Sequence, residues 1–447
     1  MNDDIIMNSV ENPIDNIIVV GAGVSGIMAV TELIKGGYPA DNILIIDKGK
    51  DPFKRKTKEV MHGFLGAGAW SDGKIVYKHN QIGGHLSKYC GEDKADELVA
   101  KVMDYIREFH PKPDEIMFSD PHIDPSFIKP HFDLRKAPTW HIGTNYLHIM
   151  AKNWYTWLIG SGVKFMWETE VESINFENKN LYCENSESNY TWYFDRLIYN
   201  TGKSGIDFTQ RLMDENKIMT ETKPAQIGVR FEAPQKYFQE LIDISYDFKL
   251  YQKFEEEGVS IRTFCTNNNA AYVAEEETYG MKSYNGHSYK EESKINNMTN
   301  FGIIMEIKNI NRPFEWAIDV VKKAQKGDKG VYYSPFSQRS PSISGLEVIE
   351  APEEMVEYMN NAYGEYSNFI WKFITDLNKV FKFGNNYGLY VPEVKFLSDE
   401  VLVNYYDLSL KQFPHIHFSG DSLSARGIAV SGAQGIYVAE SILRKYK

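Results

Sequence analysis

Residues 15–47 begin Asp15-Asn-Ile-Ile-Val-Val-Gly21-Ala-Gly23-Val-Ser-Gly26 and contain the strongest fold signal of the chain. A helical run follows, and the stretch closes with Asn42-Ile-Leu-Ile-Ile-Asp47. Strand, G-x-G-x-x-G turn, helix, second strand and acidic residue therefore come in the order of a dinucleotide-binding βαβ unit. An ordinary βαβ unit is the alternative, because glycines also serve ordinary turns.

Each glycine of this turn has its own role in the dinucleotide interpretation. Gly21 lets the chain turn sharply off the strand, Gly23 lets the backbone approach a pyrophosphate, and Gly26 lets the helix pack close to the sheet. The start of the helix offers unpaired N–H groups and a partial positive charge to the phosphates. Asp47 lies 21 residues beyond Gly26, where a carboxylate can accept bonds from an adenosine ribose.

Composition and charge narrow the class of protein. With 447 residues, 43% of them hydrophobic, the chain can bury a large core, and we expect two structural domains. The formal charge of −12 argues against wholesale coating of nucleic acid but does not exclude a local basic site. Cys90, Cys183 and Cys265 form no C-x-x-C pair, which fits a reducing compartment and argues against a zinc site or a redox disulfide.

The sequence shows no targeting or membrane signal. Met1-Asn-Asp-Asp lacks the basic and apolar regions of a signal peptide. No run of 18 apolar residues occurs, so no membrane span is expected. We therefore expect a soluble, cytoplasmic protein without a metal centre, and its oligomeric state stays open.

A second signal, Gly420-Asp421, stands near the other end of the chain, followed by Arg426-Gly427-Ile428 and a helix. Such a late pair can end a strand beneath a cofactor, where the carboxylate hydrogen-bonds ribityl hydroxyls. The dipole of the helix beyond would stabilise negative charge on a reduced flavin ring. Alone, a Gly-Asp pair is more often structural, but together with the first signal it favours FAD over NAD.

The third signal is Gly66-Ala-Gly68-Ala-Trp70-Ser71-Asp72-Gly73-Lys74. Small residues in series permit backbone contact with a flat ring or a phosphate, although a flexible loop is the alternative. Lys74 either lies near the flavin N1/C2=O region or is a surface lysine. From the order of the segments we also expect two further cofactor contacts: Val171, at the end of a strand, and Thr201-Gly202, where the chain crosses back near the cofactor. The predicted cofactor contacts are Gly21, Gly23, Val24, Ser25, Gly26, Asp47, Lys48, Gly68, Ala69, Ser71, Lys74, Val171, Thr201, Gly202, Gly420, Asp421, Gly427 and Ile428.

The segments predict an α/β fold with a discontinuous first domain. A three-layer, Rossmann-like FAD-binding domain should comprise residues 1–214 with 391–447, and an inserted substrate domain with a mixed or antiparallel sheet should comprise 215–390. Periodicity predicts strands over 17–20, 163–167 and 196–199 and helices over 24–34, 91–110, 145–158 and 430–443. The basic connector 48–58 is interpreted as a solvated loop, with a funnel for an anionic substrate as the alternative.

A set of motifs also occurs in order over nearly the whole chain: Gly21-x-Gly23-x-x-Gly26, Gly66 to Lys74, His141-Ile-Gly143-Thr144, Gly228-Val-Arg230-x-Glu232, Thr263-Phe264-Cys265, Asn285-Gly286, Thr299-Asn300-Phe301, Pro392-Glu393-Val-Lys395-Phe396 and Gly420-Asp421. In these motifs the sequence resembles the bacterial and phage FAD-dependent dehydrogenase-like flavoproteins, a family related in fold to the glutathione-reductase and hydroxybenzoate-hydroxylase type. The resemblance implies the fold and the FAD cofactor but says little about the substrate.

The sequence departs from this family after Cys265, where Thr266-Asn-Asn-Asn269-Ala replaces a turn that usually contains glycine and proline. Either this segment faces the substrate and changes specificity, or it is neutral drift. Some flavoproteins that resemble the family are thought to act as lyases on amino-acid-decorated nucleobases in phages. The resemblance therefore implies a non-standard reaction as an alternative.

Candidate catalytic groups come from the same motifs. Arg230 can clamp a substrate carboxylate or phosphate, or it can pair with Glu232 or another acid. Glu393 and Lys395 alternate along a strand, so one can transfer a proton with the other as its partner, although a surface ion pair is the simpler interpretation. His287 can act as an acid or base, yet a lone histidine in a turn is more often structural. Lys74 completes the catalytic candidates, and Cys265 is interpreted as a small buried hydrophobe.

These observations favour an FAD-dependent oxidoreductase that acts on a small organic substrate; either dioxygen reoxidises the flavin or NAD(P)H binds transiently. A flavin-dependent C–N lyase acting on an amino-acid-modified nucleobase is the first alternative; the basic connector favours it and the global charge disfavours extensive contact with duplex DNA. A binding or regulatory protein that holds FAD structurally is the second alternative.

Overall fold

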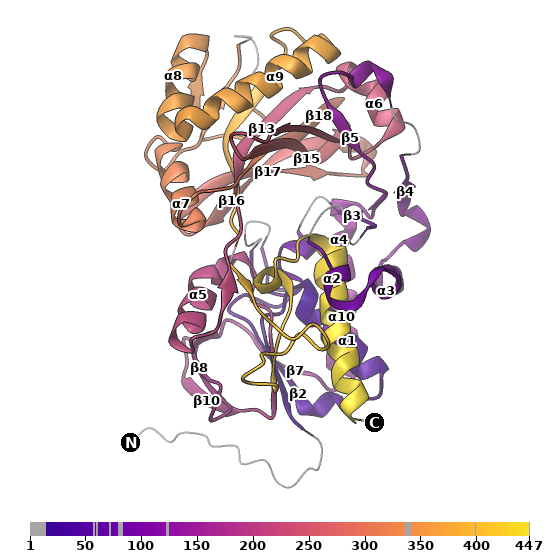
Figure 1. The fold of residues 1–447 in the computed structure, drawn as a ribbon. Coiled ribbons are helices and arrows are strands. Elements are labelled where there is room, and N and C mark those ends of the chain that lie inside the picture. Colours follow the sequence, from indigo (N-terminus) through magenta and orange to yellow (C-terminus); the bar gives the residue numbers. More distant parts are fainter. Residues whose placement is uncertain are drawn as a thin grey trace.

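The computed structural model describes residues 15–56, 59, 61–70, 73–78, 84–121, 125–335, 341–397 and 399–446. Its lower half in Figure 1 is built on a five-stranded parallel sheet. The strand order is β23 (Ile416–Phe418), β11 (Arg196–Tyr199), β1 (Ile17–Val20), β2 (Ile43–Ile46) and β7 (Lys164–Met166). All four residues of β1 and all four of β2 are buried, as expected for parallel strands covered on both faces.

Long helices and a small sheet share the core of this half. Helix α1 packs on α10, α10 on α3, and α3 on α4. These helices are α1 (Val24–Lys35), α3 (Glu92–Phe109), α4 (Thr144–Gly160) and α10 (Gly427–Tyr446). An antiparallel sheet of β8 (Glu170–Asn175), β9 (Asn180–Glu184) and β10 (Asn189–Tyr193) contributes to the same hydrophobic core. The predicted α/β class with a Rossmann-like parallel sheet is confirmed.

The upper half is built on an eight-stranded sheet with its own core. Its order is β20 (Glu347–Ile349), β19 (Val331–Tyr333), β21 (Gly388–Lys395), β13 (Ala225–Pro234), β18 (Met298–Ile307), β15 (Val259–Asn269), β14 (Lys249–Phe254) and β5 (Asp133–Arg135). Only β19 and β20 pair in parallel within this sheet. Four helices belong to this half: α6 (Gln239–Ile244), α7 (Pro313–Lys323), α8 (Pro352–Tyr363) and α9 (Ser367–Phe381). The predicted mixed sheet is therefore present.

Shorter elements lie around these two sheets. Three strands form a small sheet in the order β3 (Lys74–Val76), β6 (Thr139–His141) and β4 (Met117–Ser119), while β16 (Ala271–Thr278) and β17 (Met281–Ser288) form a hairpin. Strands β12 (Thr220–Glu221) and β22 (Glu400–Val401) pair, and the described residues also form the α-helices α2 (Ser87–Cys90) and α5 (Ile206–Glu215) and several short 3-10 helices. Within the described ranges, no helix has both the length and the apolar character needed to cross a bilayer.

The strands do not follow the predicted domain boundaries everywhere. The boundary predicted between residues 390 and 391 falls inside β21, which continues in the eight-stranded sheet to Lys395. Strand β5, which comes from the first predicted segment, pairs with β14 of the same sheet. The division into two domains itself stays a prediction.

Candidate functional site

A cleft of about 1200 Å³ lies between the parallel sheet and the eight-stranded sheet. It opens at the carboxyl ends of β1, β2 and β11, which is where ligands bind in open α/β sheets. Its volume exceeds the range of about 300–1,000 Å³ that is usual for pockets of drug-sized ligands. The cleft can therefore hold a ligand as long as a dinucleotide.

The glycine turn at the end of β1 has the geometry that the sequence predicts. Gly21 has φ +100°, and a Cβ atom on it would lie 2.9 Å from the carbonyl oxygen of Asn200. A Cβ atom on Gly26 would lie 2.4 Å from Asn200 Oδ1, so only glycine lets α1 pack this closely. A Cβ atom on Gly23 would meet nothing within 4 Å. Gly23 therefore faces open space in the cleft.

The start of α1 leaves polar groups available at the cleft. Gly23 is its N-cap and provides no side-chain hydrogen bond to the first turn. Ser25 is 4% exposed and lines the cleft, and its Oγ has no hydrogen-bond partner among the described residues. His62 Nδ1 and Ser424 Oγ, also at the cleft, are likewise buried without a partner in the described part of the chain. These atoms form a donor and acceptor set suited to a phosphate-containing ligand.

Asp47 lies at the end of β2 as predicted, and its carboxylate is largely committed to the backbone. It accepts hydrogen bonds from the N–H groups of Ala22 (2.7 Å), Gly49 (2.7 Å) and Gly63 (2.8 Å). An ionised carboxylate offers about four acceptor sites, so one remains for a ribose hydroxyl. Asp47 therefore fixes three backbone segments around the cleft, and its predicted contact with a ribose stays a prediction.

The basic connector is less exposed than the sequence indicates. Arg55 is buried and donates to the carbonyl oxygens of Glu59 (2.7 Å), Phe64 (2.8 Å) and Gly66 (2.8 Å). Burial lowers the pKa of Arg55 to about 9. The interpretation of residues 48–58 as a solvated loop is therefore wrong at Arg55. This side chain holds the Gly66–Ala69 turn at the cleft. Thr57 and Lys58 lie outside the described residues.

Most other predicted cofactor contacts lie at this cleft. Its lining includes Gly21, Gly23, Val24, Ser25, Asp47, Lys48, Gly68, Lys74, Val171, Thr201, Gly202, Gly420, Asp421, Gly427 and Ile428. Gly26 and Ala69 are buried behind the lining, and Ser71 lies outside the described residues. Arg426 Nε lies 3.1 Å from Asp421 Oδ1, so this predicted ribityl-binding carboxylate already has a cationic partner.

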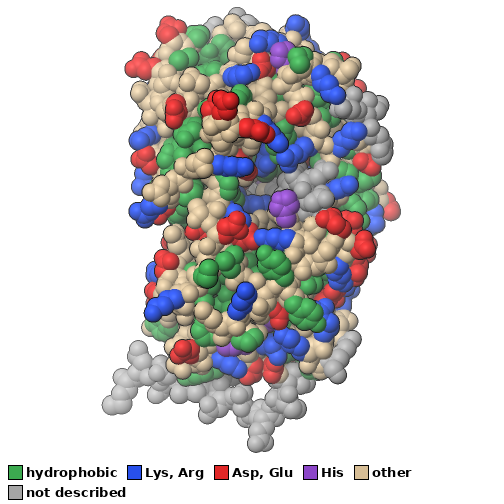
Figure 2. All heavy atoms as spheres, viewed as in Figure 1, with side chains coloured by type: hydrophobic (Ala, Val, Ile, Leu, Met, Phe, Trp, Pro, Cys, Tyr) green, Lys and Arg blue, Asp and Glu red, His purple; other side chains and the backbone are tan. Residues whose placement is uncertain are grey.

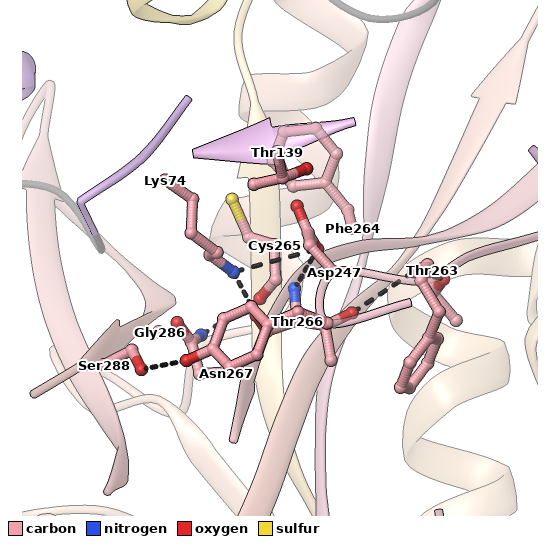
Figure 3. A network of polar contacts seen from close by, with 12 residues as sticks. Lys74, Thr139, Asp247, Thr263, Phe264, Cys265, Thr266, Asn267, Gly286 and Ser288 are labelled. Carbon is pink, nitrogen blue, oxygen red and sulfur yellow. Dashed lines mark hydrogen bonds and ion pairs between the residues drawn. The ribbon is translucent and has the colours of Figure 1, made fainter. Parts of the chain in front are cut away.

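Lys74 is a buried lysine at the cleft and not a surface residue. Its side chain is 2% exposed, and its ammonium donates to the carbonyl oxygen of Thr266 and lies 3.8 Å from Asp247 Oδ1 (Figure 3). The same carboxylate oxygen accepts from Lys249 Nζ at 2.5 Å and from the Thr266 N–H at 2.8 Å. Asp247 thus anchors Lys74 to the eight-stranded sheet.

Arg230 is part of a buried network behind the cleft wall. The residue is 0% exposed, and all three guanidinium nitrogens make hydrogen bonds, to Asn300 Oδ1, the Cys265 carbonyl oxygen and Glu393 among others. Glu393 also pairs with Lys395 Nζ at 3.0 Å. The structure supports pairing of Arg230 with an acid, and that acid is Glu393 and not Glu232. The interpretation of Glu393 and Lys395 as a surface pair is wrong, because both are buried.

Three further sequence interpretations need correction or completion. His287 lies within strand β17 and not in a turn, and it does not belong to the cleft lining. Cys265 is half-buried with φ +48° and lines the cleft, so it is not a buried hydrophobe. Asn267 and Asn268 are buried in β15, where they bond to Asn300 and Tyr246, so they support the sheet and do not face the cleft.

The cleft also contains residues that the sequence analysis missed, notably Lys203 and Arg262. Lys203 directly follows Thr201 and Gly202, so its place next to two predicted cofactor contacts is the sequence signal that could have identified it. Burial, followed by the charges of Lys395 and Arg426, lowers the pKa of Lys203 to about 8. Burial alone would lower the pKa of Lys395, but the carboxylates of Glu393 and Glu276 outweigh it and raise that pKa.

A scan against protein-family models matches none, and a search of curated proteins finds no match. Among solved structures, similarity extends to CtdE in complex with FAD (9% identity, 96% of this chain and 84% of that chain, TM-score 0.37). It also extends to the tetracycline destructase Tet(55), with 11% identity, coverage of 97% of this chain and 82% of that chain, and a TM-score of 0.41. A flavoprotein/dehydrogenase from Cytophaga hutchinsonii is similar as well, with 11% identity, coverage of 96% of this chain and 79% of that chain, and a TM-score of 0.39. Because these identities and TM-scores are low, no function is concluded from them.

Proposed function

We propose that this chain binds FAD in the cleft and is a flavin-dependent oxidoreductase acting on a small organic substrate. One observation supports the proposal above all others: the Gly21–Gly26 turn leads into an uncapped helix whose Gly23 faces open space in a cleft of about 1200 Å³. An ordinary βαβ unit has no need of such a cleft at its glycine turn.

The residues present fit an FAD molecule. The first-turn N–H groups of α1 and the partnerless Ser25 Oγ suit a pyrophosphate, and the remaining acceptor site of Asp47 suits a ribose hydroxyl. The start of α10 at Gly427, which has φ +76° and open space at its Cβ position, suits the other end of the cofactor. When bound, FAD supplies a ring that exchanges an electron pair and a proton with a substrate.

The chain's own residues would bind and orient the substrate and handle its proton. Lys74, fixed by Asp247, presents a positive charge at a constant position. Lys203, with a pKa of about 8, can hold or release a proton at Nζ near neutral pH, which suits a general acid or base. Arg230 and Glu393 position Lys395 from behind and are positioning residues in this proposal.

The reaction class is tested by anaerobic titration of the FAD-loaded protein, followed by flavin absorbance. Bleaching by NADH or NADPH would support a reductase cycle, and bleaching only by an amine-bearing substrate would support an oxidase or the lyase alternative. A flavin that binds yet is reduced by none of these compounds would contradict the oxidoreductase proposal and leave a structural flavin.

A further inference from the structure

The charge of the cleft differs in sign from the charge of the whole chain. The chain has 49 Lys and Arg residues against 61 Asp and Glu residues. Among the described residues that line the cleft, eleven are Lys or Arg and only seven are Asp or Glu. Lys and Arg side chains gather around the hollow at mid-height in Figure 2. An acidic protein thus has a cationic cleft, which attracts anions.

Part of this charge lies on the wall made by the eight-stranded sheet, and Lys203 reaches the same cleft from the short helix after β11 in the lower half. Lys395 Nζ lies 5.1 Å from the centroid of the Phe264 ring, and the Arg262 guanidinium lies 5.5 Å from the same centroid. Lys203 is near enough to Lys395 for the two charges to interact. We call Lys203, Lys395 and Arg262 the cationic row. Glu393, the partner of Lys395, is 0% exposed and lies behind the lining.

Two members of the row form no close ion pair with a described carboxylate. Among the described residues, no carboxylate lies within 4.0 Å of the Lys203 ammonium or of the Arg262 guanidinium. Arg262 Nη1 donates instead to the hydroxyl of Tyr251 at 2.8 Å, which leaves the charge unmatched. For Lys203, burial and the charges of Lys395 and Arg426 lower the pKa more than the carboxylates of Glu276 and Asp421 raise it, so an anionic ligand would stabilise the ammonium.

We propose that the substrate carries a carboxylate or phosphate group and that Lys203 and Arg262 bind this group, with Lys395 adding charge. This inference rests on the proposed function, because it assigns the cationic row to the substrate and the Gly21–Gly26 turn to the cofactor. Arg262 lies on β15 of the upper sheet, whereas α1 and its glycine turn lie in the lower half (Figure 1). Arg262 can therefore be tested separately from the glycine turn, whereas Lys203 directly follows the predicted cofactor contacts Thr201 and Gly202, so its variant also needs a measurement of FAD affinity.

The pH dependence of binding follows from the groups that face Lys203. These are Lys395 of β21, Glu276 of β16, and Asp421 and Arg426 near the start of α10. The ammonium binds an anion and the neutral amine does not, so affinity should fall as the pH rises through about 8.

The experiment uses the FAD-loaded full chain and isothermal titration with three probes: benzoate, the uncharged isostere benzamide, and inorganic phosphate. The variants are Lys203→Gln and Arg262→Gln, with Lys308→Gln as the matched control because exposed Lys308 lies outside the cleft lining. We expect at least one anion to bind, benzamide to bind more weakly, and each cleft variant to lose about tenfold in affinity. The stronger anion identifies the group as carboxylate or phosphate.

Stability and FAD affinity are measured for every variant, so that misfolding and loss of cofactor are separated from loss of the anion. Lys203→Gln should also lose the pH dependence near 8, which a purely structural defect would not remove. Equal binding of benzoate and benzamide, unchanged anion affinity in both variants, or a Lys203→Gln variant that loses FAD but keeps the anion would each overturn the proposal. Failure of FAD to bind at all would instead count against the proposed function.

Discussion

Replacing Gly23 by alanine tests the glycine turn without disturbing the fold. Gly23 has φ −67° and ψ 178°, a conformation that alanine adopts freely, and its Cβ would meet nothing within 4 Å. The stability of the protein should therefore hardly change. The new methyl group would instead occupy the space in which a pyrophosphate approaches the backbone.

The size of the effect follows from the bonds that the methyl group blocks. Loss of one or two hydrogen bonds to a charged phosphate, each contributing about 1.5–3 kcal/mol, should weaken FAD binding by about 10- to 100-fold or more. Gly26→Ala should behave differently, because its Cβ would lie 2.4 Å from Asn200 Oδ1 and 2.5 Å from the Gly21 carbonyl oxygen. Such overpacking should lower the free energy of unfolding by about 1–3 kcal/mol.

The assay is FAD titration of the apoprotein by quenching of flavin fluorescence, together with urea unfolding. Gly160→Ala is the matched control, since its Cβ also meets nothing within 4 Å and the residue ends α4 away from the cleft lining. The control should bind FAD like the wild type. Wild-type FAD affinity in Gly23→Ala would refute the assignment of the turn to the pyrophosphate.

Three further changes test other parts of the account. Ser25→Ala should leave thermal stability unchanged, because Ser25 Oγ has no partner among the described residues, and should weaken FAD binding by about 3- to 10-fold in the same titration. Glu393→Gln should lower the free energy of unfolding by about 3–5 kcal/mol in urea, because it leaves Arg230 and Lys395 buried without their carboxylate; an unchanged midpoint would contradict that role. Burial lowers the pKa of His417 to about 4, so as the pH falls the imidazole is protonated in the unfolded chain before it is protonated in the folded protein. The free energy of unfolding should therefore fall by about 3 kcal/mol between pH 6.5 and 4. His417→Gln, compared with the wild type by unfolding at several pH values, should lose this dependence.

Local sequence signals predicted the parts of the fold that depend on neighbouring residues. Helix α1 begins at Val24 and ends at Lys35, within a residue of the range that periodicity predicts, and Gly36 is its C-cap. The unbroken apolar runs of β1 and β2 are typical of parallel strands covered on both faces, and every residue of both strands is buried. The glycine turn was predictable because its steric demands lie within one βαβ unit.

Contacts between distant strands could not be predicted from these signals. Arg230 and Glu393 are 163 residues apart, and they meet only because β13 and β21 pair in one antiparallel register. Lys203, in the short helix after β11, and Lys395, at the end of β21, become neighbours at the cleft from different halves of the structure. A single sequence contains no information on such register, so the acid partner of Arg230 and the cationic row emerged only from the structure.

Binding of FAD in the cleft can be measured by the absorbance spectrum of the purified full chain after incubation with FAD and removal of free cofactor. We expect the two visible bands of an oxidised flavin and a stoichiometry of about one FAD per chain, as for a single dinucleotide turn. A colourless protein that retains no FAD after this treatment, while folded by circular dichroism, would contradict this expectation.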